Sequence, residues 1–246
     1  AWIPFYKETL TEKYPSSSLY STVEKEGFTV PVTDRWYLKD NYVDEIWNQI
    51  IESELRKYKR YKYSDLGFYI CAKIVENVSG QPLNKYAMET FYKPLGLKTA
   101  GFNPLDKFDA YRIPPTEEDK YFRMQKIQGH VHDMGAAMLG GVSGHAGLFA
   151  EAKDVAIIMQ MLVNGGYYGG TRYLKPETIK KFTTRYSKST RRGLGFDMKE
   201  LNTKKSQNVS KMASKNTFGH LGFTGIATWA DPDNDLIYVF LSNRTY

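Results

Sequence analysis

YKYSDLGF, at residues 61–68, stands where an amphipathic helical pattern begins. Apolar side chains recur at helical spacing after it, and Gly80 follows as a helix-ending glycine. We therefore predict a helix over residues 66–79. Its predicted inward face is formed by Ile70, Ile74, Val75 and Val78. The single cysteine of the chain, Cys71, lies in this helix, and we expect a buried, unreactive thiol.

The turn before this helix holds three polar side chains in a row: the phenol of Tyr63, the hydroxyl of Ser64 and the carboxylate of Asp65. Ser64 or Asp65 can cap free N–H groups of the first helical turn. A phenol at this place is suited to passing a proton to a leaving group. A structural interpretation also stays open, in which Tyr63 only covers the edge of a core.

TFGHLGFTG, at residues 217–225, precedes a predicted terminal hairpin. Glycines let a strand backbone approach a ligand closely, and such an edge can offer an N–H group to a developing oxyanion. The candidate site residues here are His220, Leu221, Gly222 and Phe223. The alternative for His220 is a histidine at a strand end that hydrogen bonds with solvent.

Helices followed by terminal strands indicate an α+β chain. Periodicity predicts helices over residues 43–57, 82–92 and 151–164, one beginning near 176, and helical turns at 133–139. Strands are expected over 225–230 and 236–242, and residues 1–45 and 98–130 are predicted to be irregular. We treat 1–246 as one domain, with a mainly helical part from about 40 to 190 and a sheet-forming part from about 191 to 246.

Composition excludes several classes of protein. No apolar run has the length of a membrane span, and one cysteine cannot form an intrachain disulfide. The net charge is +7, with basic residues gathered at 56–62, 180–192 and 199–215. Because these clusters are scattered and no nucleic-acid-binding fold accompanies them, we expect no nucleic-acid partner.

The remaining histidines, His130, His132 and His145, lie in GHVHDMGAAMLGGVSGHAG at residues 129–147. His-x-His-Asp has the spacing of metal ligands, but no carboxylate-rich partner motif follows. We therefore expect no metal and no cofactor. Hydrogen bonds that fix loops are the predicted role of these histidines.

The order of the motifs is the most specific feature of the chain. YSD is followed by KPLGL, PPTEED, VHD, GGVSGHAGLF, GHLGFTG and SNR. This ordered set resembles the β-lactamase-like serine hydrolases, which include class C β-lactamases, penicillin-binding proteins, DD-peptidases and esterases. The opening WIPFYKETL and the wording of YKYSDLGF are most similar to the β-lactamase-like domain appended to family 3 β-N-acetylglucosaminidases of Bacteroidetes-type bacteria.

The resemblance implies a β-lactamase/transpeptidase-like fold, with an antiparallel sheet flanked by helices beside an all-helical subdomain. It implies that Tyr63 is the catalytic tyrosine and that Asp65 takes the place of an asparagine. His220 would take the place of the lysine or histidine that opens the third motif. The backbone N–H of Phe223 would then be one oxyanion donor.

Three departures from the family pattern stand out. The first motif, Ser-x-x-Lys, supplies the nucleophile, and no serine of this chain has a lysine three places on. The resemblance therefore implies a fragment that lacks segments at both ends. Leu221 replaces a threonine hydroxyl, and an ionised Asp65 cannot donate the hydrogen bond of an asparagine amide.

These observations predict a serine hydrolase domain that acts on cell-wall-related amides or esters through an acyl-enzyme, and that is inactive without its nucleophile. The alternative is a non-catalytic glycan- or peptide-binding module, covalently linked to a glycosidase domain. Glycosidase activity of the chain itself is not expected, because no carboxylate pair stands out. The resemblance also implies a periplasmic, cell-envelope or secreted location.

Overall fold

The chain forms two compact units. The structure is a computed structural model that describes residues 3–58, 61–187 and 189–246. Unit 1 comprises Ala1–Met88, Gly101–Phe149 and Thr245–Tyr246, and unit 2 comprises Glu89–Ala100 and Ala150–Arg244. These units differ from the predicted division near residue 190, because the helices that follow residue 150 group with the terminal strands.

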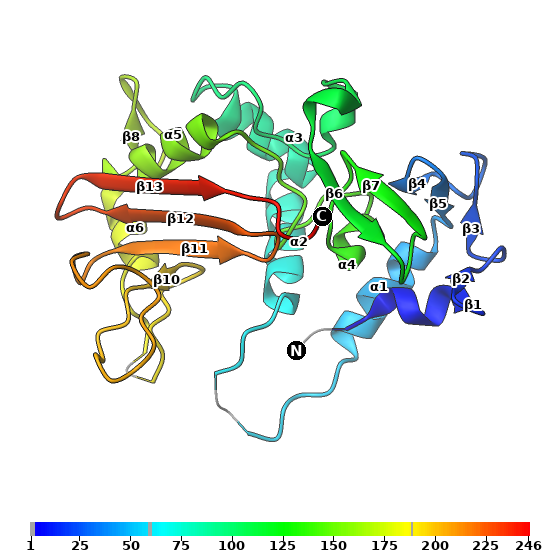
Figure 1. Cartoon of the computed structure of the whole chain (residues 1–246), viewed down its shortest axis with the longest axis horizontal. Coiled ribbons are helices and arrows are strands. Elements are labelled where there is room, and N and C mark those ends of the chain that lie inside the picture. The colour runs from blue at the N-terminus through cyan, green and yellow to red at the C-terminus, as the bar shows by residue number, and fades with distance from the viewer. Residues whose placement is uncertain (1–2, 59–60, 188) are drawn as a thin grey trace. The chain divides into compact units, whose positions relative to one another are not determined.

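Unit 1 contains short helices and small antiparallel sheets (Figure 1). Its helices are α1 (Tyr42–Ile51), α2 (Leu66–Ser79), α3 (Leu83–Ala87), α4 (Met134–Ala137) and the 3-10 turns Phe5–Thr9, Pro104–Asp106 and Ala110–Arg112. Its strands are β1 (Leu10–Thr11), β2 (Tyr14–Pro15), β3 (Tyr20–Ser21), β4 (Val30–Thr33), β5 (Trp36–Leu38), β6 (Pro115–Asp119) and β7 (Gln125–Gln128). Strand β1 pairs with β2, β6 pairs with β7, and β5 lies between β3 and β4.

The core of unit 1 gathers apolar side chains from distant parts of the sequence. Ile46 and Ile50 of α1 are buried in it. The ring of Phe122, from the β6–β7 turn, lies 5.9 Å from the ring of Tyr20 in an edge-on arrangement. Helix α1 ends at Ile51, earlier than predicted. The hairpin β6–β7 corrects the prediction that residues 98–130 are irregular throughout, and strands β1 to β5 correct the same prediction for residues 1–45.

Helix α2 begins and ends where the sequence predicted, but its predicted buried face is wrong. Ile70, Ile74 and Val78 are exposed, and Cys71 is exposed as well, so the expected buried thiol is also wrong. The helix is buried through Tyr69, whose ring contacts the rings of Phe5 and Trp47. The large aromatic residue therefore decides which side faces the core, against the aliphatic periodicity.

Unit 2 is a four-stranded antiparallel sheet with a helix on one face. Its helices are α5 (Ala152–Val163) and α6 (Pro176–Phe182), and a π-helix, Met88–Tyr92, spans the boundary between the units. Its strands are β8 (Tyr167–Tyr168), β9 (Thr171–Arg172), β10 (Asp197–Met198), β11 (Phe218–Gly222), β12 (Ile226–Asp231) and β13 (Leu236–Leu241). The sheet order is β10-β11-β12-β13, which confirms the predicted terminal hairpin.

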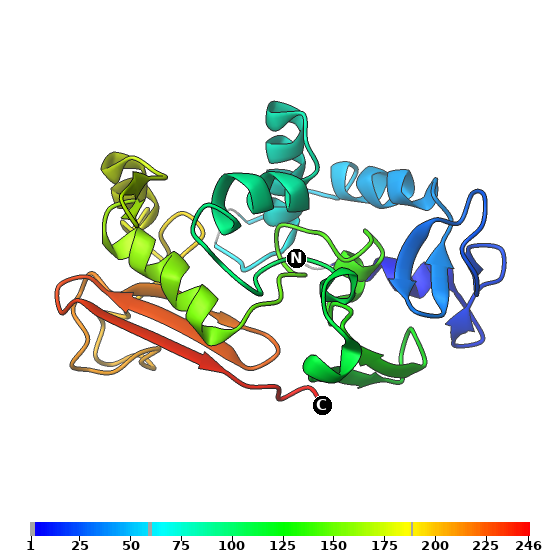
Figure 2. The same ribbon diagram turned by 90° about the horizontal axis from the view of Figure 1, so that it is seen from above.

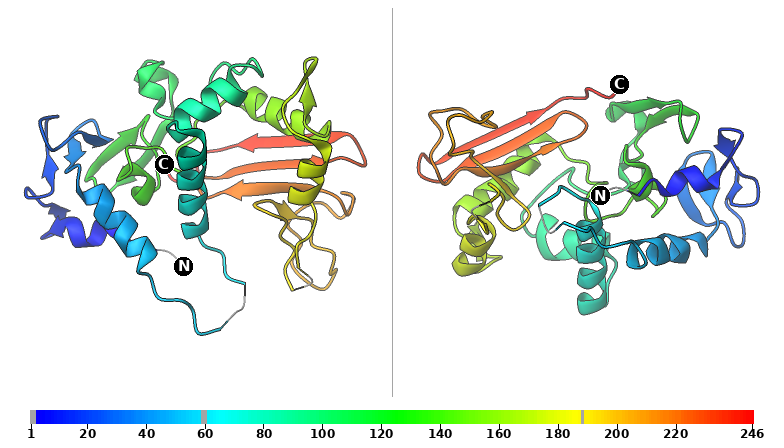
Figure 3. Two further views of the ribbon diagram at one scale, coloured as in Figure 1. Left: turned by 180° about the vertical axis from the view of Figure 1, so that it is seen from behind. Right: turned by 90° about the horizontal axis from the view of Figure 1, so that it is seen from below.

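The two faces of this sheet differ. Helix α5 lies along one face, as Figures 2 and 3 show, and Met159 packs there with Met198, Phe218 and Ala230. On the other face, Leu221 and Phe240 stand on either side of Ala227, and both are about half exposed. In the part of the chain that the structure describes, β13 pairs with β12 alone and forms an edge of the sheet.

Among the described residues, no helix combines the length and the hydropathy that crossing a bilayer requires.

Candidate active site

The YSD turn directly precedes α2 in unit 1. The Ser64 hydroxyl accepts a hydrogen bond from the backbone N–H of Leu66 at 3.3 Å, as predicted for a capping residue. Asp65 occupies the N-cap position, but its side chain makes no capping hydrogen bond. Tyr63 is about half exposed. Ser64 therefore caps the start of α2, and the partly buried carboxyl of Asp65 makes no capping hydrogen bond.

The surroundings of Asp65 favour its protonated form. Burial raises the pKa of Asp65, the nearby Asp133 raises it further, and the positive charge of His145 acts in the opposite direction. Burial also raises the pKa of Tyr69, with contributions from Asp133 and Asp65. A protonated carboxyl can donate a hydrogen bond. The environment thus lessens the chemical difference between Asp65 and an asparagine.

His145, in the loop that follows α4, connects helix α2 to Asp133 at the start of α4. Its Nε2 lies 2.8 Å from Asp133 Oδ1, and its Nδ1 lies 2.9 Å from Ser143 Oγ. Its ring stacks on Tyr69 of α2, with 4.2 Å between the ring centres. Asp133 also caps α4 by accepting a hydrogen bond from the N–H of Ala136. Although burial opposes it, the contacts with His145 and Ala136 lower the pKa of Asp133, so this residue is the ionised partner.

Ser143, His145 and Asp133 are connected in the order of a Ser-His-Asp triad, but they are placed as a support. Ser143 is 5% exposed and the His145 side chain 4% exposed, so neither reaches a substrate from solvent. The loop also needs its glycine beside α2: a Cβ atom on Gly144 would lie 2.3 Å from the carbonyl oxygen of Phe68. The three residues therefore hold the start of α2 in place.

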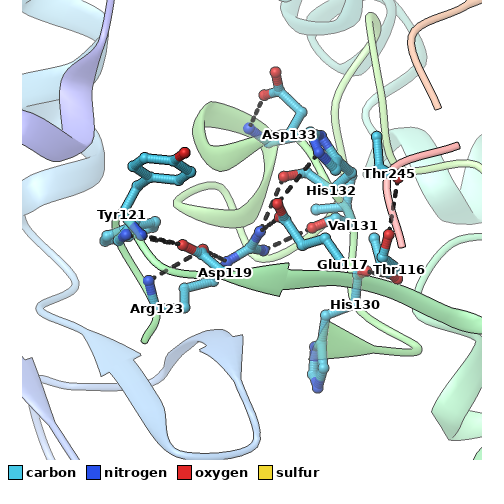
Figure 4. A network of polar contacts seen from close by, with 12 residues as sticks. Thr116, Glu117, Asp119, Tyr121, Arg123, His130, Val131, His132, Asp133 and Thr245 are labelled. Carbon is cyan, nitrogen blue, oxygen red and sulfur yellow. Dashed lines mark hydrogen bonds and ion pairs between the residues drawn. The ribbon is translucent and has the colours of Figure 1, made fainter. Parts of the chain in front are cut away.

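A buried arginine anchors the segment that leads to Asp133 (Figure 4). The Arg123 side chain is inaccessible to solvent and donates to Asp119 at 2.7 Å and to Glu117 at 2.5 Å. It also donates to the carbonyl oxygens of Val131 at 2.7 Å and His132 at 3.0 Å. The chain thus enters α4 from two fixed carbonyl groups. Arg123 belongs to none of the motifs of the sequence.

The histidines of this region fix loops, as predicted. His130 contacts Asp34 at 2.7 Å, and His132 lies 3.3 Å from Glu117. His145 binds Asp133 as described above. Among the described residues, histidine, cysteine and acidic side chains form no group of three or more that could hold a metal ion.

His220 lies on β11 in unit 2. Arg192 Nη1 is 2.9 Å from His220 Nε2, and His220 Nδ1 is 2.7 Å from the carbonyl oxygen of Leu221. His220 therefore has hydrogen-bond partners within the protein, which the structural alternative of a solvent-bonded histidine did not include. Gly222 is the last residue of the strand, and the exposed Phe223 begins the turn that follows.

The SNR segment holds this turn. Arg244 Nε donates to the carbonyl oxygen of Phe223 at 2.6 Å, and its guanidinium lies 4.8 Å from the Phe223 ring centre. The Ser242 hydroxyl donates to the carbonyl oxygen of Gly225 at 2.6 Å. Gly225 has a φ of +103°, and a Cβ atom there would meet the Ser242 hydroxyl at 2.5 Å. The turn therefore requires glycine at 225.

The candidate residues form two sets. Tyr63 and Asp65 belong to unit 1, and residues 220–223 belong to unit 2. Each set has its own supporting contacts, from His145 in the first case and from Arg192 and Arg244 in the second. His145 and Arg244 stand in motifs of the sequence, GGVSGHAGLF and SNR, whereas Arg192 stands in none of them.

A family model described as beta-lactamase matches residues 26–246. The chain belongs to the beta-lactamase family. All candidate site residues of this beta-lactamase-family chain lie within the matched stretch. Membership confirms the resemblance to the β-lactamase-like proteins and the predicted α+β class.

Curated relatives cover part of the same stretch. A protein of Escherichia coli K12 named "Putative D-alanyl-D-alanine carboxypeptidase" is 40% identical over 196 residues, which are 75% of this chain and 45% of the relative. A protein of the same name from Salmonella agona is 38% identical over 196 residues, with the same coverage of 75% and 45%. The beta-lactamase-family chain thus spans about half the length of these relatives.

Solved structures support the fold. A penicillin-binding protein homologue from Caulobacter crescentus aligns with a TM-score of 0.56 at 21% identity, over 80% of this chain and 58% of the homologue. A beta-lactamase from Mycobacterium bovis aligns with a TM-score of 0.52 at 22% identity, over 78% of this chain and 60% of that protein. Both belong to the beta-lactamase and penicillin-binding-protein type of fold that the motifs predicted.

Proposed function

We propose that this beta-lactamase-family chain supplies the Tyr63, Asp65 and His220 parts of a serine hydrolase site that cleaves cell-wall-related amides or esters. The observation that carries the proposal is the position of Asp65, partly buried at the start of α2 beside the Asp133–His145 pair. Burial of a carboxyl that does not cap its helix costs free energy, and titratable groups with such perturbed pKa values cluster at functional sites. The family membership supports this interpretation.

The proposed reaction passes through an acyl-enzyme. A serine hydroxyl attacks the substrate carbonyl, the amine or alcohol leaves with a proton, and water then releases the acid. Tyr63 carries the proton between nucleophile and leaving group. Protonated Asp65 donates a hydrogen bond to the acyl side of the substrate, and the N–H of Phe223 stabilises the oxyanion.

The nucleophile is the missing component of this reaction. Because no serine here is followed by lysine at the third position, we expect the 246 residues alone to form no acyl-enzyme. The serine would come from a Ser-x-x-Lys segment outside them.

An intact-mass assay with penicillin and a fluorophosphonate tests the proposal. The 246-residue chain is expected to keep its mass, while a parent polypeptide that includes a Ser-x-x-Lys gains one adduct. Tyr63→Phe in the parent should slow adduct formation by about a hundredfold or more, since general acid–base groups contribute factors of that size. Tyr61→Phe, an exposed tyrosine two positions earlier, is the matched control.

Two outcomes would contradict the proposal. Labelling of the 246-residue chain itself would place a nucleophile within it. A folded parent polypeptide that neither probe labels would favour the second candidate, a glycan- or peptide-binding module.

The second candidate rests on the departures from the family pattern. Leu221 in the place of a threonine weakens the recognition of a substrate carboxylate, and an ionised Asp65 in the place of an asparagine cannot donate a hydrogen bond to an acylamide carbonyl. In this alternative the module is covalently linked to a β-N-acetylglucosaminidase domain. Both candidates act in the cell envelope, the periplasm or outside the cell, and neither has a nucleic-acid partner.

A further inference from the structure

The contacts of His220 define which of its nitrogens carries the proton. Arg192 Nη1 lies 2.9 Å from Nε2, and the Leu221 carbonyl oxygen lies 2.7 Å from Nδ1. A guanidinium N–H can only donate, and a carbonyl oxygen can only accept. Nε2 must therefore present its lone pair, and Nδ1 must carry the proton. Both contacts select the same form, the neutral Nδ1–H tautomer.

We propose that Arg192 is a positioning residue that holds His220 as the neutral Nδ1–H tautomer, so that the positive charge of the third motif lies on the guanidinium. In the family pattern, this motif opens with a lysine or histidine. The catalytic role of the Arg192–His220 contact rests on the proposed hydrolase function, whereas the geometry of that contact does not depend on the proposed function.

The neighbours of Arg192 explain why it faces His220. Arg191 forms a two-bond contact with Asp197, with Nε at 2.6 Å and Nη2 at 2.8 Å from its two carboxylate oxygens. Arg192 Nε lies 3.6 Å from the same carboxylate. Two arginines thus share one buried carboxylate, and the cluster keeps one positive charge in excess.

The strand register places this charge next to the histidine. Asp197 of β10 lies opposite Gly219 of β11, the residue directly before His220. The Arg192 side chain is 22% exposed, so it is largely held within the protein. The guanidinium is therefore held beside β11 at the point where the motif begins.

This arrangement restricts what His220 can do. Its Nε2 lone pair is used by Arg192, and its Nδ1 proton is used by the Leu221 carbonyl. An imidazole with both nitrogens engaged is not available as a general base. Proton transfer in the proposed reaction is then left to Tyr63, and Arg192 supplies a charge that stays fixed across the working pH range.

Nitrogen-15 NMR of histidine-labelled chain tests the inference directly. Two-bond proton–nitrogen spectra near pH 7.5 give different patterns for the Nδ1–H, Nε2–H and doubly protonated forms, and His220→Gln identifies the signals of His220. We expect the Nδ1–H pattern in the wild type. We expect a mixture with the Nε2–H form in Arg192→Ala, where only the Leu221 carbonyl still selects Nδ1–H. We expect the wild-type pattern to be kept in Arg192→Gln, because a glutamine amide also donates an N–H.

Arg172→Ala is the matched control, since Arg172 binds the carbonyl oxygens of Gly165 and Leu174 elsewhere in unit 2. It should leave the His220 pattern unchanged. An Nε2–H or doubly protonated His220 in the wild type would overturn the proposal, as would an unchanged pattern in folded Arg192→Ala. If Arg192→Ala does not fold, loss of the pattern in folded Arg192→Gln overturns it as well.

The result is separable from the proposed function. An intact Nδ1–H pattern in a parent protein that forms no acyl-enzyme would leave Arg192 as a positioning residue and remove the hydrolase proposal. Absence of the Nδ1–H pattern in a parent protein that forms the acyl-enzyme would remove the proposed role of Arg192 and leave the hydrolase proposal in place.

Discussion

Replacing Arg123 by methionine is expected to destabilise unit 1 severely. The side chain is inaccessible to solvent, as is that of Asp119, and the Glu117 side chain is 10% exposed. Methionine fills a similar volume but leaves both carboxylates without their cation. Two charge-assisted hydrogen bonds at about 1.5–3 kcal/mol each give a loss on the order of 3–6 kcal/mol. Loss of one partner of a buried ion pair, at about 3–5 kcal/mol, gives a similar figure.

Urea unfolding followed by tryptophan fluorescence measures this loss. Trp36 is a suitable reporter because its Nε1 donates to the Arg123 carbonyl oxygen at 3.2 Å. Arg112→Met is the control, since Arg112 is exposed and lies over the ring of Phe108. It should change the unfolding free energy by less than about 0.5 kcal/mol.

The buried ion pairs also predict a rescue. Combining Arg123→Met with Glu117→Gln and Asp119→Asn removes the buried charges together, and it should recover much of the lost stability. A loss below about 1 kcal/mol in Arg123→Met would show that the network is not a buried ion-pair cluster. A triple variant no better than the single one would show that the lost carbonyl contacts, and not the charges, dominate.

Two further predictions concern acidic residues. Because burial raises the pKa of Asp65, the folded chain holds its proton more tightly than the unfolded chain does, so this group's contribution to stability falls as pH rises above 3.8. Asp65→Asn should therefore flatten that decline in melting temperature measured against pH, and equal slopes in the two proteins would contradict it. Asp154 accepts hydrogen bonds from the backbone N–H groups of Lys98, Thr99 and Ala100, which outweigh its burial and lower its pKa, so its stabilising contribution is lost as pH falls below 3.8. Asp154→Asn should cost about 2–3 kcal/mol and reduce hydrogen-exchange protection at residues 98–100, and an unchanged melting temperature would count against this role.

Local patterns predicted the elements whose own residues determine them. The α5 helix and the β12–β13 hairpin follow from periodicity and turn residues within single segments, and both were predicted with bounds close to those observed. The face of α2 was predicted wrongly, because its burial depends on Phe5 and Trp47, which approach Tyr69 from distant parts of the chain. Periodicity shows that a helix has an apolar side, but it cannot show which partners are present to cover it.

The supporting residues of the candidate site were harder to predict than the motifs. Tyr63 and His220 lie in recognisable sequence motifs, whereas Arg123 lies among charged residues that are typical of an exposed loop. Its burial depends on the β6–β7 pairing and on carbonyl groups eight and nine residues later. Likewise, nothing near His220 in the sequence indicates Arg192, which lies 28 residues earlier. Contacts of this kind are set by tertiary structure and leave no local signal.

The edge formed by β13 has a consequence for how the chain behaves in solution. Backbone N–H and C=O groups on such an edge accept any extended strand, because main-chain hydrogen bonds do not depend on side-chain identity. Tyr238 and Phe240 of β13 are about half exposed, and their burial against a second strand would be favourable. The motif residues bind only ligands of matching chemistry. The β13 edge can pair with any strand that is present, so self-association along β13 should increase with protein concentration.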